Sequence, residues 1–168
     1  MSIYTKEIFP SGYSVIRKDR DIRDGGVLLA VKDTINITQL SSPSNLEMIS
    51  VEIDPDLILC LIYQPPNSSD QNNSTLLSYL TSLDKTKNTL FIGDLNLPDA
   101  DWEVYGGNSL IADEFAEMAY NYNLTPYVTG PTHRDGNTLD IVLSNLDNIY
   151  HTETNSTLYQ LTFHQTIT

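Results

Sequence analysis

An apolar, β-prone run at residues 89–92 leads directly into Gly93, Asp94, Leu95 and Asn96. A short run of this type, bounded by polar residues, predicts a buried strand. Side chains alternate along a strand, so Asp94 and Asn96 are expected on one side of its end, with Leu95 on the other. A carboxylate beside an amide suits phosphate ester chemistry, because the carboxylate can deprotonate a water and the amide can donate a hydrogen bond without adding charge. The same residues also make an ordinary strand-end turn, so alone they do not decide the function.

Most of the remaining chain is typical of strands. Short apolar or alternating runs predict further strands at residues 13–18, 26–32, 35–40, 46–53, 57–63, 127–128, 139–143 and 158–167. A turn at residues 54–56 separates two of these strands, which predicts that they form an antiparallel hairpin.

Two helices are expected among the strands. The first covers residues 74–83, after a polar loop at 67–73, because four leucines recur there at helical spacing. Asn108 or Ser109 can cap the second helix. The expected apolar face of that second helix consists of Ile111, Phe115, Met118, Ala119 and Tyr122.

The length and composition fit a single globular domain over residues 1–168, with 40% hydrophobic residues. No stretch of the sequence approaches the ~18 consecutive apolar residues that a membrane-spanning helix needs. The first residues also lack the apolar core of a signal peptide. The single cysteine, Cys60, lies in an apolar run and is expected to be a small buried hydrophobe. These features predict an intracellular protein, in the nucleus or the cytoplasm, and argue against secretion and against a membrane partner.

The charge is strongly acidic, with 9 basic and 22 acidic residues and a net charge of −13. Proteins that bind duplex DNA usually present a basic surface, because they neutralise phosphates and release counterions. The basic residues here cluster only at Arg17, Lys18 and Arg20, with Arg23 nearby. Two interpretations stay open: weak DNA binding that depends on a divalent cation and other parts of a larger protein, or no nucleic-acid binding at all.

Five motifs occur in a characteristic order. They are GGVLLAV at 25–31, YQPP at 63–66, GDLNLPDADW at 93–102, GPTH at 130–133 and NTLDIVLSN at 137–145. Over about residues 8–168, this order resembles the endonuclease/exonuclease/phosphatase superfamily. More narrowly, it is similar to the endonuclease domain of LINE-type (non-LTR) retrotransposon reverse transcriptase polyproteins. The resemblance implies an α/β fold, a four-layer sandwich of two packed mixed β-sheets flanked by helices.

The sequence departs from that family at both ends. Family members begin with a strand that ends in Asn and a second strand that ends in a metal-binding Glu, and Glu7 does not match that segment. The family's closing Ser-Asp-His triplet corresponds here to Thr162, Phe163 and His164, so the Asp is replaced. We therefore expect a fold that is incomplete at the N-terminus, and an exposed apolar sheet edge where strands are missing.

The resemblance also implies roles for individual residues. Asp94 would activate the attacking water, and Asn96 would hold that water or a phosphate oxygen. Tyr63 would donate a hydrogen bond to the phosphate, and His164, oriented by Asp140, would stabilise the transition state. The expected substrate-binding residues are Thr132, His133 and Asn137. We expect the catalytic side chains to converge at one end of the sandwich.

Each assignment has a structural alternative. Tyr63 can simply end a core strand, and Asp140 can be a carboxylate with a structural partner, which it needs because an isolated buried charge is costly. His133 and His164 can be surface residues. Trp102 is expected to anchor its loop by packing rather than to stack on a base.

Phosphodiester chemistry of this type calls for a hard cation with oxygen ligands. The resemblance implies Mg²⁺ or Mn²⁺, with Asp94 and Asn96 as ligands and weak binding because two family carboxylates are absent. The implied function is nicking of target DNA, which yields a 3′-hydroxyl that primes reverse transcription, with the rest of a retrotransposon polyprotein as partner. This chain alone is expected to nick DNA poorly or not at all. The alternatives are an inactive remnant that serves as a binding or structural module, and a phosphoesterase of the same superfamily with a non-DNA substrate.

Overall fold

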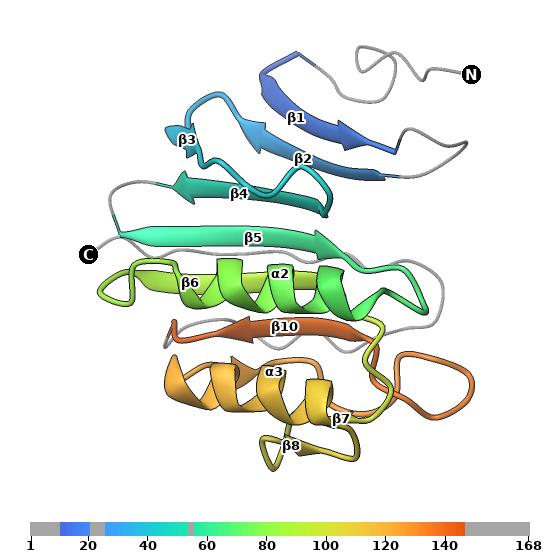
Figure 1. Cartoon of the computed structure of the whole chain (residues 1–168). Helices are drawn as coiled ribbons and strands as arrows, with labels where there is room; N and C mark the ends of the chain where they lie inside the picture. The colour runs from blue at the N-terminus through green and yellow to red at the C-terminus, as the bar shows by residue number, and fades with distance from the viewer. Residues whose placement is uncertain (1–10, 21–25, 54–55, 147–168) are drawn as a thin grey trace.

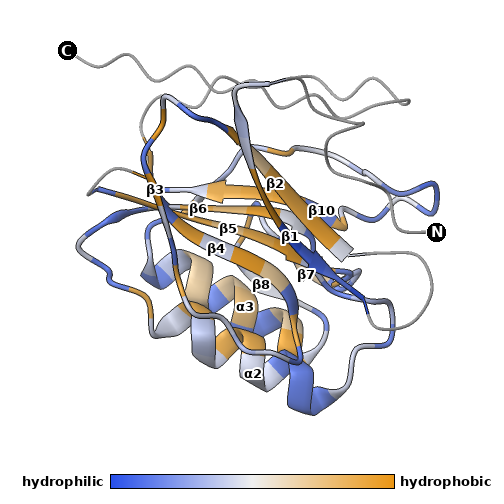
Figure 2. Ribbon diagram, turned by 90° about the horizontal axis from the view of Figure 1, so that it is seen from above, coloured by the Kyte–Doolittle hydropathy of each residue, from blue (hydrophilic) through white to orange (hydrophobic). Residues whose placement is uncertain are grey.

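The computed structural model describes residues 11–20, 26–53 and 56–146. Its centre is a mixed sheet of six strands in the order β3-β4-β5-β6-β10-β9 (Figure 1). The strands of this sheet are β3 (Ile37–Gln39), β4 (Glu47–Ile53), β5 (Leu57–Tyr63), β6 (Asn88–Asp94), β10 (Asp140–Ser144) and β9 (Thr125–Pro126). Helices α2 (Asp70–Thr81) and α3 (Leu110–Asn121) lie against one face of the sheet. The antiparallel pair β1 (Tyr13–Asp19) and β2 (Gly26–Lys32) lies on the other face (Figure 2).

The chain order explains the mixture of strand directions. β4 and β5 form the predicted antiparallel hairpin. β5 and β6 are parallel, which requires a crossover connection, and α2 supplies it. Between β6 and β10 the chain forms the small antiparallel pair β7 (Ala100–Asp101) and β8 (Gly106–Gly107), then α3 and β9. β6 therefore lies between β5 and β10 in the middle of the sheet.

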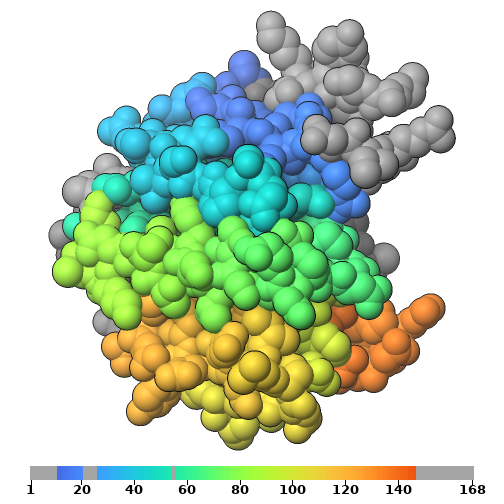
Figure 3. All heavy atoms as spheres, in the orientation of Figure 1, coloured from blue at the N-terminus to red at the C-terminus, as the bar shows by residue number. Residues whose placement is uncertain are grey.

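One face of the sheet packs against the helices. Phe91 of β6, Cys60 of β5 and Phe115 of α3 are fully buried in this helix-side core. Ser69 and Ser109 cap the two helices by accepting hydrogen bonds from the backbone N–H groups of Asn72 and Ala112. In the space-filling view, the helices and their connecting turns cover this face of the sheet (Figure 3).

The opposite face forms a second core beneath β1 and β2. Side chains alternate along the strands, so every second residue of β4, β5, β6 and β10 points to this side. The direct neighbours Ile49, Leu61, Ile92 and Val142 make one apolar row across the four strands. Val27 of β2 is buried against the same cluster. This hairpin-side core is where the two sheets meet.

The predicted α/β class is confirmed, and so are most of the predicted elements. Among the described residues the second sheet of the expected sandwich consists of β1 and β2. The expected apolar face of α3 is confirmed, since its members pack in the helix-side core. No helix of the described part of the chain is long and apolar enough to cross a membrane. The strand expected at 158–167 lies outside the described residues.

Three boundaries were predicted wrongly. The loop expected at 67–73 is partly helical, because Ser69 caps α2 one turn earlier than the leucine pattern indicates. The strand expected at 127–128 is instead β9 at Thr125–Pro126, although the Tyr127 N–H still donates to the Val142 carbonyl at 2.8 Å. Of the strand expected at 35–40, only Ile37–Gln39 pairs with β4.

Candidate functional site

A polar row ends the hairpin-side face of the sheet. Glu47, Tyr63, Asp94 and Asp140 are direct cross-strand neighbours on β4, β5, β6 and β10. They continue the pattern of the apolar rows, so their side chains point to the side of the sheet that faces β1 and β2. All four are partly exposed. We call these four residues the polar row; it lies at the end of the sheet to which the β5 arrow points in Figure 1.

Strand direction explains why these residues meet. The parallel strands β5 and β6 end at the same edge of the sheet, with Tyr63 and Asp94 as their last residues. The antiparallel strand β10 begins at that edge with Asp140. Tyr63, Asp94 and Asp140, which the sequence assigns to one site, are thus adjacent, whereas His164 lies outside the described residues.

Gly93 permits the close approach of β5 and β6 beside Asp94. It has a φ of +138°, and a Cβ at this position would collide with the Ile62 carbonyl oxygen of β5. Glycine has no Cβ and adopts positive φ without steric cost. The backbone next to Asp94 therefore requires the glycine of the GDLN motif.

We expect Gly93→Ala to destabilise the fold by about 2–5 kcal/mol, as the sum of backbone strain and overpacking. Gly130→Ala is the matched control, because Gly130 also has positive φ (+81°) but a Cβ there would meet nothing within 4 Å. Urea unfolding of both variants measures the difference. Equal free-energy losses would show that the contact with Ile62 is relieved by small shifts of the strands.

A tight turn follows Asp94. The Asp94 carboxylate accepts a hydrogen bond from the Asn96 backbone N–H at 2.8 Å. Asn96 adopts a φ of +46°, a conformation that asparagine tolerates better than most residues. Its side-chain amide donates to the Gln64 carbonyl at 2.7 Å, which ties the turn to the end of β5. The simple alternation expected for a continuing strand therefore stops at Asp94, and Asn96 is held by the turn.

The pKa of Asp94 is raised above its ordinary value of 3.8. Burial is the largest cause, because it disfavours the charged carboxylate, and the neighbouring Asp140 raises the pKa further. The Asn96 backbone N–H and His133 lower the pKa, but do not cancel the rise. A raised carboxylate pKa is suited to a group that takes a proton from water.

The three predicted substrate-binding residues lie in one loop between β9 and β10. The Thr132 hydroxyl accepts hydrogen bonds from the backbone N–H groups of Leu139 and Asp140, each at 3.0 Å. The Asn137 carbonyl accepts from the backbone N–H groups of Thr132 and His133, also at 3.0 Å. Thr132 thus positions the start of β10, and the loop carries His133 close enough to Asp94 to influence its pKa. Substrate binding by these residues stays a prediction.

One residue of the polar row, Glu47, and its partner Arg20 were not assigned a role from the sequence. Glu47 begins the alternating strand β4, and Arg20, from the basic cluster, forms a salt bridge with it at 2.7 Å. A search for polar residues at the ends of apolar strands would have found Glu47, because it is the first residue of β4. The contact with Arg20 depends on the packing of the two sheets, which local patterns do not specify.

Trp102 packs as predicted. Only 4% of it is exposed, and it belongs to the helix-side core, away from the polar row. It is a packing residue of the loop that follows the GDLN turn.

The fit of the site to a divalent cation is partial. No group of three or more His, Cys, Asp or Glu side chains within residues 11–20, 26–53 and 56–146 could hold a metal ion. The adjacent carboxylates of Asp94 and Asp140 remain. Mg²⁺ is often bound by one or two carboxylates together with waters and substrate phosphates. These residues therefore fit a weakly held Mg²⁺ that shares its shell with substrate, and do not fit a metal caged by protein alone.

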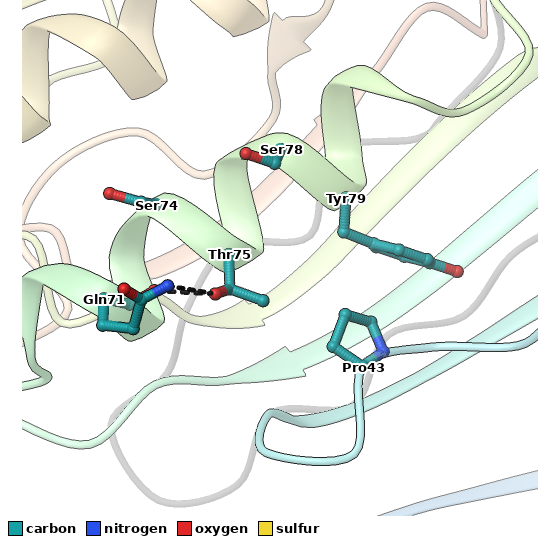
Figure 4. A pocket seen from close by; sticks show the side chains of 6 residues that line it. All are labelled: Pro43, Gln71, Ser74, Thr75, Ser78 and Tyr79. Carbon is teal, nitrogen blue, oxygen red and sulfur yellow. Dashed lines mark hydrogen bonds between the residues drawn. The ribbon is translucent and has the colours of Figure 1, made fainter.

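A separate hollow lies on the helix side of the molecule, between α2 and the loop before β4 (Figure 4). Its lining residues are Pro43, Gln71, Ser74, Thr75, Ser78 and Tyr79. It carries no charged group and is on the face opposite the polar row, so it is not part of the candidate site.

Comparisons with known proteins agree with this arrangement. A family model described as endonuclease-reverse transcriptase matches residues 57–167, and the chain therefore belongs to this family, within the endonuclease/exonuclease/phosphatase superfamily. The matched segment begins at β5 and contains Tyr63, Asp94 and Asp140 of the polar row. No curated protein matches the sequence.

The fold is shared with solved structures that include the following three. The endonuclease domain of TRAS1, a telomere-specific non-LTR retrotransposon, is 15% identical, with a TM-score of 0.53 over 79% of this chain and 64% of that one. The 3′ phosphatase NExo from Neisseria, bound to a product DNA hairpin, is 14% identical, with a TM-score of 0.53 over 83% and 71%. An AP endonuclease from Archaeoglobus fulgidus is 16% identical, with a TM-score of 0.51 over 83% and 71%. The chain thus spans somewhat less than two thirds of the TRAS1 domain.

Proposed function

We propose that this chain is a metal-dependent phosphodiesterase-type domain whose ancestral role is to nick target DNA during retrotransposition. The observation that supports the proposal most is the direct adjacency of Tyr63, Asp94 and Asp140 in one row. A phenol donor and two carboxylates on neighbouring strands are a suitable set for phosphate ester hydrolysis. Membership of the endonuclease-reverse transcriptase family favours DNA over other phosphate esters. The proposal includes the remainder of a polyprotein as partner and a location in the nucleus or cytoplasm.

In this proposal, Asp94 takes the proton from the attacking water. Its raised pKa makes it a better base than an ordinary carboxylate. Asn96, fixed by its bond to the Gln64 carbonyl, uses its second amide N–H to hold the water or a phosphate oxygen. Tyr63 donates a hydrogen bond to the phosphate where negative charge develops.

Asp140 and Thr132 complete the arrangement. The Thr132 hydroxyl fixes the backbone at the start of β10, and this places the Asp140 carboxylate beside Asp94. In the proposed site Asp140 orients His164. A bound Mg²⁺, held by Asp94 with Asn96 or Asp140, would neutralise charge on the phosphate and the leaving oxygen.

Two alternatives each have an observation in their favour. The net charge of −13 and the partial fit to a metal favour a domain that has lost catalysis and serves as a binding or structural module. The same net charge, which disfavours DNA binding, also favours a phosphoesterase of the same superfamily with a non-DNA substrate.

Relaxation of supercoiled plasmid tests the proposal. We expect slow conversion to the open circle with Mg²⁺ or Mn²⁺, no conversion with EDTA, and none by Asp94→Ala. Bis(p-nitrophenyl) phosphate, a phosphate diester without nucleotides, is assayed in parallel for hydrolysis. DNA binding without either reaction would favour the inactive module, and hydrolysis of the small diester without nicking would favour the other phosphoesterase.

A further inference from the structure

Arg20, which directly follows β1, reaches the polar row from the opposing sheet. Its guanidinium donates from Nε to one Glu47 carboxylate oxygen at 2.7 Å and from Nη2 to the other at 2.9 Å. This is a bidentate pair, which fixes the plane of the guanidinium as well as its position. The side chains of Arg20 and Glu47 are 32% and 18% exposed, so the pair is accessible to solvent at the end of the sandwich.

The same guanidinium lies over Tyr63. Its central carbon is 5.0 Å from the centre of the Tyr63 ring, within the range of a cation–π contact. Tyr63 is the direct neighbour of Asp94, so Arg20 is placed one side chain away from the proposed base. A guanidinium carries five N–H donors; the pair with Glu47 uses two of them, and Tyr63 is a further hydrogen-bond partner. It therefore keeps donors for a second anion.

The negative charges of the polar row disfavour phosphate binding unless a cation offsets them. Glu47, Asp94 and Asp140 place three carboxylates along one edge of the sheet, and an approaching phosphate diester is repelled by them. Another cation of the hairpin sheet, Lys18, donates from Nζ to the Pro43 carbonyl at 2.8 Å, and burial lowers its pKa. Arg20 is therefore the better placed cation to offset this repulsion.

We propose that Arg20 is a phosphate-binding residue of the site, with Glu47 as the positioning residue that orients it over Tyr63. Arginine suits this role because its planar fork matches the two oxygens of a phosphate, whereas lysine offers a point charge. The inference rests on the proposed function in taking a DNA phosphodiester as the ligand. The proposal also assigns a function to a member of the basic cluster at Arg17, Lys18 and Arg20.

The salt dependence of DNA binding tests the proposal. A labelled duplex oligonucleotide is titrated with the full chain with Ca²⁺ in place of Mg²⁺, so that a divalent cation is present, and binding is followed by fluorescence anisotropy over a series of KCl concentrations. Removal of one phosphate contact lowers the slope of log K against log salt by about one. We expect this for Arg20→Gln, and a smaller loss of affinity for Arg20→Lys.

Two further variants separate phosphate binding from a structural ion pair. Glu47→Gln keeps the Arg20 charge but leaves only one of the two oxygens that orient the guanidinium, so it should weaken DNA binding by less than Arg20→Gln does. Lys85→Gln removes one positive charge that lies over the Tyr122 ring, before β6 begins and therefore at the other end of the sheet, and should leave the slope unchanged. Thermal unfolding of all variants in the same buffer identifies any that are misfolded.

The outcomes distinguish the two proposals. A native chain that binds DNA with an unchanged slope in Arg20→Gln overturns the role of Arg20 and leaves the proposed function intact. Equal loss of thermal stability in Arg20→Gln and Glu47→Gln, with no effect on DNA binding, assigns the pair to structure alone and also overturns it. A native chain with no DNA binding at low salt overturns the DNA substrate and the role of Arg20 together.

Discussion

Asp94→Asn is expected to lower the rate of plasmid nicking by about 10²- to 10⁴-fold, the usual contribution of a general base. The asparagine keeps an oxygen that can accept the hydrogen bond from the Asn96 N–H, so the turn should be preserved. The variant loses the capacity to take a proton from water and a carboxylate that would hold Mg²⁺. Plasmid relaxation with Mg²⁺ measures the rate, and Glu117→Gln, an exposed change of the same charge on α3, is the control.

The same variant should be more stable than the native chain at neutral pH. The folded-state pKa of Asp94 is raised, so the folded protein holds this proton more tightly than the unfolded chain does. The resulting stability is fully present below the ordinary pKa of 3.8 and is lost as the pH rises through the raised folded-state value. Asparagine does not ionise, so Asp94→Asn keeps this stability as the pH rises.

Urea unfolding in EDTA over a pH series measures this effect. We expect the free energy of unfolding of Asp94→Asn to exceed that of the native chain at pH 7, and the difference to vanish as the pH falls below the ordinary value for aspartate. A less stable variant at pH 7 would show that the hydrogen bond from Asn96 outweighs burial and the repulsion from Asp140. Higher stability with lower activity is the expected signature of a carboxylate held for chemistry.

The sequence predicts the strand order along the chain well, because short apolar runs between polar turns have few alternatives. It also predicts that Tyr63, Asp94 and Asp140 come together, since each ends or begins an apolar strand and the motifs occur in a family order. The start of α2 was missed because Ser69 and the polar residues after it can equally form a loop. Helix caps are decided by single hydrogen bonds, which periodicity does not reveal.

Contacts between the two sheets were beyond local patterns. The pair between Arg20 and Glu47 joins residues 27 positions apart, and it exists because the β1–β2 hairpin crosses the face of β4. The requirement for glycine at position 93 also depends on a contact with a residue that is distant in the sequence. A Cβ at this position would collide with Ile62 on the neighbouring strand, and Ile62 is not part of the motif.

The largest expected loss of stability is for Phe91→Ala. Phe91 is fully buried in β6, the strand between β5 and β10, with Cys60 and Leu143 as its cross-strand neighbours. Truncation of a buried phenylalanine costs about 3–5 kcal/mol through lost burial and the cavity left behind. For a chain of this size, that lowers the thermal midpoint by roughly 6–20 °C. Leu110→Ala, at a residue that is 77% exposed, is the control and should change stability by less than about 0.5 kcal/mol.

Phe91 and Asp94 point to opposite faces of the same strand. Phe91→Ala therefore tests whether packing on the helix side affects the geometry of the polar row. If β6 is a rigid support, Phe91→Ala should keep its nicking rate at temperatures where it remains folded, and lose it only as the folded fraction falls. Unfolding monitored by circular dichroism gives that fraction, and plasmid relaxation gives the rate at each temperature. A rate that falls well before the folded fraction does would show that the helix-side core sets the geometry of the polar row.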